Sequence, residues 1–206
     1  MKEEIKMGEL EYKIQFYSEW HTGSGLTSGS DLDALVIKDE NNLPFIPGKT
    51  LKGLIKEACE NYNQLTGNKF NKLINKYFGT ESSLEGSPEL SFNGQAHFTN
   101  AMISAELKNR ILKGGKVENG TKITNHLFRA IASTAIGDNG VAKQHSLRRM
   151  ETVIPLVLYA KVLFLEDDEI KPFIIESIGM IKRLGQNRHR GLGRCSFEVV
   201  KKGESL

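Results

Sequence analysis

Apolar and polar residues alternate near the start of the chain and then change to a helical spacing. Between residues 10 and 16 every second residue is apolar, which is the period of a half-buried β-strand. Between residues 51 and 65 the apolar residues recur at three- and four-residue intervals, which predicts an amphipathic helix of about four turns. Residues 44–48 contain two prolines and a glycine, so we expect a turn directly before that helix.

The second half of the chain has a similar order of patterns. Residues 153–164 are apolar and typical of a strand, residues 173–184 have helical spacing, and residues 195–200 predict a last strand. Residues 90–98 give a weaker strand pattern. The predicted order β-α-β-β-α-β is that of an α+β, ferredoxin-like (RRM-like) fold. Many RNA-binding domains share this fold, but topology alone does not give function.

Two regions interrupt the predicted core. Residues 66–90 are polar and broken by glycines, and residues 108–124 carry three glycines among lysines, so we expect the second stretch to be a mobile insertion. We therefore expect a single domain over residues 1–206, with insertions at about 66–90 and 104–150.

Composition limits the types of partner. The net charge of +3 is modest, so affinity for nucleic acid must come from local clusters of lysine and arginine. Cys59 and Cys195 are far apart and no His/Cys group has zinc-ligand spacing, so we expect no structural zinc. Residues 1–8 have no apolar signal core and no run is long enough for a membrane span, so a cytoplasmic location without a membrane partner is expected.

A glycine–arginine loop lies near the carboxyl end. Residues 187–194 set two glycines among three arginines and a histidine, and five basic residues lie between Lys182 and Arg194 without an acid. Such glycines allow the main chain to approach a polyanion, while arginines supply cationic forks. A charge run by itself is commonly a solvated face. The residues expected to bind RNA in this loop are Arg188, Arg190, Gly191, Gly193 and Arg194.

Several segments can be compared together with known families: residues 20–25, 33–39, 43–53, 77–79, 96–101, 140–151 and the glycine–arginine loop. In their order and chemistry these segments resemble one family, the CRISPR-associated RAMP superfamily. The resemblance is to the backbone subunit of type III effector complexes, of the III-D-like or Csm-like kind. It implies a subunit of antiviral defence that stacks along a guide RNA (crRNA), beside copies of itself or similar RAMP subunits and other type III subunits. It also implies a thumb-like β-hairpin that disturbs the duplex with target RNA.

The resemblance places two segments along the guide RNA. Lys49, Thr50 and Lys52 follow a Pro-Gly turn that opens a helix, where free N–H groups and the positive end of the dipole favour phosphate. The alternative is an ordinary capped helix with solvated lysines. His21, Gly23 and Ser24 belong to a glycine-rich segment with the character of a backbone anion site. The alternative for His21 is a residue that only caps the first strand.

The thumb region keeps a basic composition. Arg129, Lys143, Arg148 and Arg149 are expected to meet RNA phosphates, and the alternative is an exposed hairpin whose charges serve solubility. Relatives commonly have an aspartate directly after the isoleucine, whereas here Gly137 and Asp138 follow Ile136.

Asp33 is the candidate catalytic residue. It lies where cleaving relatives place an essential aspartate, on a loop facing the target strand, and Asp31 is the alternative. One carboxylate near a phosphate can help to hold Mg²⁺ or Mn²⁺, whose other ligands are waters and phosphate oxygens. The neighbouring ribose hydroxyl would then attack in line. The alternative is a loop aspartate that bonds its own backbone.

The leading hypothesis is a subunit that binds guide RNA and, as a metal-dependent endoribonuclease, cleaves complementary target RNA. Three alternatives remain open. The first is a non-cleaving filament subunit. The second is a guide-processing RAMP endoribonuclease that uses histidine and no metal. The third is an RRM-type module, which stacks bases on sheet aromatics, although the sequence lacks the motif that such modules carry.

Overall fold

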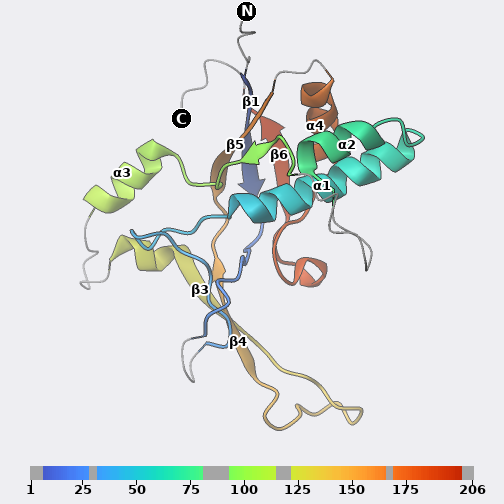
Figure 1. Ribbon diagram of the computed structural model, residues 1–206. Coiled ribbons are helices and arrows are strands. Elements are labelled where there is room, and N and C mark those ends of the chain that lie inside the picture. Colours follow the sequence, from blue (N-terminus) through green and yellow to red (C-terminus); the bar gives the residue numbers. More distant parts are fainter. Residues whose placement is uncertain (1–6, 28–31, 81–92, 115–121, 166–168, 201–206) are drawn as a thin grey trace, which may run out of the picture.

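The computed structural model describes residues 7–27, 32–80, 93–114, 122–165 and 169–200. Figure 1 shows a sheet covered by helices, with a long hairpin that extends away from both. The elements in chain order, η marking short 3-10 helices, are β1 (Met7–Phe16), α1 (Gly48–Leu65), α2 (Asn71–Phe78), β2 (His97–Phe98), α3 (Ala105–Lys113), η1 (Ile123–Leu127), β3 (Phe128–Ser133), β4 (Arg148–Val153), β5 (Val157–Leu165), α4 (Ile170–Ile178), η2 (Arg188–Arg190) and β6 (Cys195–Val199).

The main sheet has the strand order β2-β5-β1-β6. All three of its pairings are antiparallel. If the β3–β4 hairpin is set aside as an insertion, the core strands follow the order 2-3-1-4, with α1 after the first and α4 after the third. This is the ferredoxin-like arrangement, so the predicted α+β fold class is confirmed.

One face of the sheet forms the core. Alternate residues of β1 and β5 are buried, beginning with Leu10 and Leu158, because successive side chains of a strand point to opposite faces. Helices α1, α2 and α4 cover this face (Figure 1). Leu51, Ile55 and Cys59 form the buried stripe of α1 at the predicted spacing.

The other face of the sheet is charged. Lys13 of β1 lies 3.1 Å from Glu198 of β6, and Lys161 of β5 lies 2.7 Å from Glu9. The hydrogen bond to Glu9 holds the pKa of Lys161 above its ordinary value. These cross-strand pairs place acidic groups across the exposed face.

Two strand predictions need correction. The apolar stretch 153–164 is not one strand, because β4 ends at Val153 and β5 begins at Val157, on either side of Pro155, which has no N–H to donate to a ladder. Within residues 90–98 only His97–Phe98 are a strand, and residues 81–92 lie outside the described residues.

The helix predicted over 173–184 also needs correction. Helix α4 ends at Ile178 with Gly179 at its cap, whereas Ile181 and Leu184 are buried from a non-helical segment. The predicted insertions contain helices as well: α2 lies within 66–90, and α3 occupies part of the stretch expected to be mobile. Ser104 caps α3 by accepting a hydrogen bond from the N–H of Leu107, which explains why the helix starts there.

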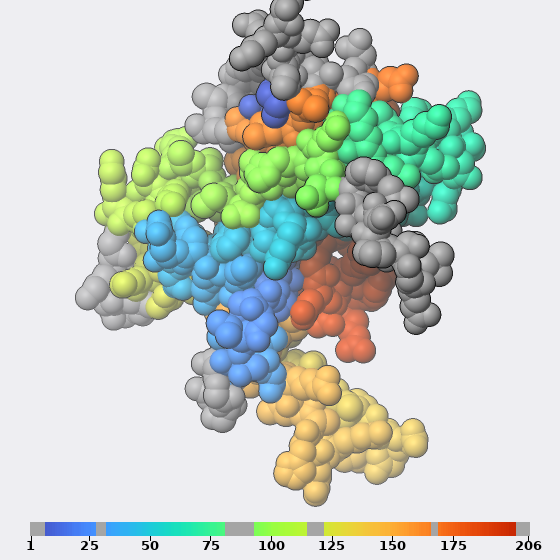
Figure 2. All heavy atoms as spheres, in the orientation of Figure 1, coloured from blue at the N-terminus to red at the C-terminus, as the bar shows by residue number. Residues whose placement is uncertain are grey.

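Strands β3 and β4 form the predicted thumb-like hairpin. Their register runs from Phe128 opposite Val153 to Ser133 opposite Arg148. Beyond the strands the hairpin is closed by a turn in which the N–H of Gly137 donates to the carbonyl of Val141. Gly137 and Asp138, where the sequence differs from the pattern of its relatives, therefore lie in a tight turn at the tip. The hairpin projects from the body of the molecule in the space-filling view (Figure 2).

No helix among the described residues combines the length and apolar character that a bilayer crossing needs.

Candidate RNA interface

Residues 17–22, which follow β1, form a junction segment to which the surrounding loops are bonded. The N–H of Gly193 donates to the carbonyl of Glu19 at 2.7 Å. Trp20 and Val153 exchange two backbone hydrogen bonds, which join the segment to the root of the hairpin. The N–H of Ile37 donates to Thr22. The junction segment therefore holds the glycine–arginine loop, β4 and residues 32–38 in one place.

His21 lies in the interior of this junction. Its side chain is fully buried, and its Nδ1 lies 2.6 Å from the carbonyl oxygen of Glu151. Because that oxygen can only accept, Nδ1 must carry the proton. The backbone carbonyl of His21 accepts from the N–H of Gln186. The imidazole thus cannot touch RNA in this structure, and the prediction that His21 binds RNA is replaced by a structural function between β4 and the glycine–arginine loop.

The two glycines predicted to approach RNA differ in their surroundings. Gly191 has φ of 94° and open space where a Cβ would stand, so its main chain faces solvent. Gly193 has φ of 69°, and a Cβ there would lie 1.8 Å from the carbonyl oxygen of Leu184. Gly193 is therefore required by packing inside the protein. Gly185, which the sequence reasoning missed, has the same constraint, since its Cβ would lie 2.5 Å from the His21 oxygen.

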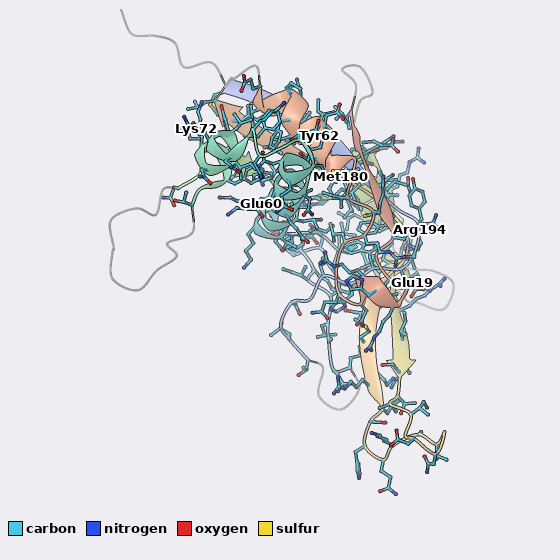
Figure 3. All side chains as sticks on the ribbon, turned by 90° about the vertical axis from the view of Figure 1, so that its right-hand side faces the viewer. Glu19, Glu60, Tyr62, Lys72, Met180 and Arg194 are labelled. Carbon is cyan, nitrogen blue, oxygen red and sulfur yellow. The ribbon has the colours of Figure 1, made fainter. Side chains whose placement is uncertain are left out.

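The arginines in and near the loop differ in whether they form hydrogen bonds or ion pairs within the protein. Arg183 donates to the carbonyl of Arg188 at 2.6 Å, and the Arg188 guanidinium lies 3.9 Å from Glu57 of α1. Arg190 and Arg194 are exposed and form no ion pair within the described part of the chain. Figure 3 shows Arg194 and Glu19 at the level where the sheet meets the hairpin. Two weakly hydrated guanidinium groups, each able to donate several hydrogen bonds, are therefore available to meet an anion here.

Asp33 is exposed beside β4, near the end of the β3–β4 ladder that lies away from Val153. Its Oδ2 accepts a hydrogen bond from the N–H of Arg149 at 2.7 Å, and its own N–H donates to the Arg149 carbonyl at 2.8 Å. The carboxylate thus bonds a different strand, not its own loop. Among the described residues Oδ1 has no hydrogen-bond partner, so one carboxylate oxygen faces outward. Asp31 lies outside the described residues.

The glycine-rich segment after the junction is paired internally. The N–H and the hydroxyl of Ser24 both donate to the carbonyl of Leu35, and the hydroxyl also accepts from the N–H of Leu26. Gly23 bridges to Val36 in the same ladder. The predicted anion site at Gly23 and Ser24 is thus a small β-ladder, and only its outer surface could meet RNA.

The start of α1 presents a basic surface. Its first turn has no acidic residue, and the N–H of Gly48 donates to the side chain of Asn100 instead of to a capping residue before the helix. Thr50 is exposed and is not the cap. Lys49, Lys52 and Lys56 line an open pocket of about 340 Å³, and none of the described residues that line it is acidic. Lys56 was missed by the sequence reasoning, although it follows Lys52 by one helical turn.

The basic residues of the hairpin lie along its exposed surface. Lys143, Arg148 and Arg149 are exposed and form no ion pair among the described residues. Arg129 is the exception, because its guanidinium donates to Glu19 at 2.9 Å. Arg129 therefore links the hairpin to the junction segment, and only part of its charge faces outward.

The donor set for a metal is limited. No group of three or more His, Cys, Asp or Glu side chains gathers among the described residues. Burial raises the pKa of Cys59 and of Cys195 to about 12, so both thiols stay protonated. Asp33, with one outward oxygen, is compatible with a cation whose remaining ligands come from water and phosphate.

Comparison with known proteins decides the family. The sequence matches the model of the RAMP superfamily over residues 13–196. The chain belongs to the RAMP superfamily. Comparison with curated protein sequences found no match. The resemblance to this superfamily that the sequence analysis described is therefore confirmed.

Solved structures show the same fold. A chain of the type III-B Cmr-beta complex bound to cognate target RNA has a TM-score of 0.67 and 15% identity, over 93% of this chain and 97% of that chain. A chain of the apo state of Cmr-beta has a TM-score of 0.66 and 16% identity, over 94% of this chain and 98% of that chain. These relatives come from type III-B, whereas the sequence resemblance pointed to the III-D-like or Csm-like kind.

The two glycines give a first prediction. Gly193→Ala should lower the free energy of unfolding by about 3 kcal/mol or more, because a strained φ is combined with a backbone clash. Gly191→Ala should lower it by only about 1 kcal/mol, because its φ is strained but its space is open. Urea unfolding of both variants measures the difference. Equal losses would contradict the packing function assigned to Gly193.

Proposed function

We propose that this protein is an RNA-binding backbone subunit of a type III CRISPR interference complex, which binds guide RNA and cleaves complementary target RNA. The proposal rests mainly on one observation: segments from different regions of the sequence come together at the junction segment. Residues 33–39 and Phe45, β4, and the glycine–arginine loop come from three separate regions of the sequence, yet each of them is hydrogen-bonded to the junction segment. The similar fold of a chain from a complex bound to cognate target RNA supports it.

The guide would lie across the glycine–arginine loop and the start of α1. Arg190, Arg194, Lys49 and Lys52 supply cations, while Gly191 leaves the main chain open to a phosphate. Such contacts hold the RNA backbone and leave sequence reading to base pairing, as in other RNA-guided proteins.

Target cleavage would take place at Asp33. The carboxylate is exposed and held by the backbone of Arg149, which with Arg148 places exposed basic side chains on the same strand. Mg²⁺ or Mn²⁺ held by Asp33, water and phosphate would supply charge neutralisation at the phosphate. The 2′-hydroxyl of the adjacent ribose attacks the phosphorus as the bond to the 5′-oxygen breaks, so the products are a 2′,3′-cyclic phosphate and a 5′-hydroxyl.

Two alternative functions are disfavoured by specific observations. A guide-processing enzyme with His21 as general acid or base conflicts with the complete burial of that imidazole. An RRM-type module would use the exposed sheet face. Tyr17 and Tyr159 lie on that face, but Lys13 and Lys161 are paired there with Glu198, Glu9 and Glu11, which compete with phosphates for these cations. The non-cleaving filament subunit differs from the proposed subunit only in that it does not cleave target RNA, so a cleavage assay distinguishes the two.

Neutralising Asp33 tests the catalytic assignment. Asp33→Asn keeps an oxygen that can accept from Arg149 but removes the charge, so target cleavage by the assembled complex should fall at least about 100-fold. Binding of guide and target should be unchanged. Glu40→Ala, which removes an exposed carboxylate in the turn nearby, should cleave like the parent. The measurement is the single-turnover cleavage rate with Mg²⁺, and parent-like cleavage by Asp33→Asn would exclude this site.

Removing loop arginines tests guide binding. Arg190→Ala and Arg194→Ala should weaken guide RNA binding, and each should reduce the salt slope by about 0.7, the value for one phosphate contact on a single strand. Thermal stability should change little, because neither side chain forms an ion pair within the described residues. Arg110→Ala, on the exposed side of α3, is the control. Salt slopes equal to that of the parent would contradict the proposed guide path.

A further inference from the structure

Glu151 of β4 is connected to residues 34–38 through its buried side chain and its backbone N–H, and to His21 of the junction segment through its backbone carbonyl. Its residue is only 8% exposed, and Oε2 accepts from the N–H of Val36 at 3.0 Å. Oε1 accepts from the ammonium of Lys38 at 2.7 Å. Its backbone N–H donates to the carbonyl of Ala34, and its backbone carbonyl faces Nδ1 of His21. A buried carboxylate whose two oxygens both accept hydrogen bonds has a fixed geometry.

Lys38 is held in turn by the hairpin. Its ammonium lies 4.0 Å from the centre of the Phe128 ring, the first residue of β3. The cation is therefore placed between the carboxylate of β4 and an aromatic face of β3. This arrangement ties residues 34–38 to both strands of the hairpin at its root.

Asp33 lies at the end of the segment that Glu151 holds. Arg149, Met150 and Glu151 are consecutive residues of β4, and they bond or bridge to Asp33, Ala34 and Val36. The same stretch of β4 contacts the glycine–arginine loop, because the Asn187 amide lies 3.1 Å from the sulfur of Met150. This three-residue stretch of β4 therefore contacts both the glycine–arginine loop, where guide binding is proposed, and the segment that carries Asp33, where cleavage is proposed.

We propose that Glu151, paired with Lys38, is a positioning residue that fixes the loop carrying Asp33 against β4. This inference rests on the proposed cleavage at Asp33, but the contact itself does not. Without the Glu151 carboxylate, the N–H of Val36 loses its acceptor and Lys38 loses its anion, so residues 33–38 separate more readily from the hairpin. The chemistry at Asp33 is then slowed although Glu151 never touches the RNA.

Hydrogen exchange tests the contact independently of cleavage. In Glu151→Ala the amides of Asp33 and Val36 should exchange about tenfold faster or more than in the parent. Glu151→Gln should give a smaller increase, because it keeps an acceptor for Val36 and loses only the ion pair with Lys38. Glu198→Gln, which removes a carboxylate paired with Lys13 on the exposed sheet face, should leave both amides unchanged. Unchanged exchange in Glu151→Ala overturns the proposal.

Cleavage kinetics test the consequence. In the assembled complex, Glu151→Gln should lower the single-turnover rate about 10- to 100-fold and raise the Mg²⁺ concentration needed for half the maximal rate. The dissociation constants for guide and target should stay at parent values, which a general loss of folding would not allow. Parent-like cleavage by Glu151→Gln, with Asp33→Asn inactive, overturns only the positioning function. Parent-like cleavage by Asp33→Asn overturns the proposed function as well.

Discussion

The backbone hydrogen bonds of residues 17–22 are the constraint on which the rest of this protein depends. Tyr17 donates to the carbonyl of Arg194, Glu19 accepts from Gly193, and Trp20 is paired in both directions with Val153. Trp20 and His21 are fully buried, so unpaired backbone groups beside them would have no water to replace the lost partner. The segment therefore holds its neighbours in one register.

This constraint explains why the loop that faces solvent is also rich in glycine. Gly185 and Gly193 let the chain pass within contact distance of the His21 and Leu184 carbonyls. The arginines between and after them are thereby presented from a backbone that is fixed at both ends. A fixed scaffold loses little conformational entropy when it binds a flexible polyanion, which suits the proposed binding of RNA without reading of its bases.

Strong local periodicity made much of the fold predictable from the sequence. Strand β1 and helix α1 were placed nearly correctly because alternation and helical spacing persist over many residues. The end of α4 was missed because Ile181 continues the helical spacing after the backbone has left the helix at Gly179. Helix α3 was hidden by the neighbouring glycines and lysines.

The candidate site was predictable as a set of segments but not as a geometry. Arg149 and Asp33 are 116 residues apart in the chain, and no local pattern indicates that they bond to each other. The burial of His21 could not be predicted from the sequence either. Its residue type and its glycine-rich neighbours are typical of a functional histidine, yet it lies in the interior. Glu151 and Gly185 escaped notice because their importance comes from long-range packing alone.

Assembly on RNA tests the central claim most directly. A backbone subunit must present two different faces to its neighbours, so copies add along the guide without closing into a ring or dimer. Mass photometry of the purified protein with single-stranded guide RNAs of increasing length measures the number of copies bound. For a backbone subunit we expect stepwise growth in mass with RNA length. One protein per RNA at every length would contradict it.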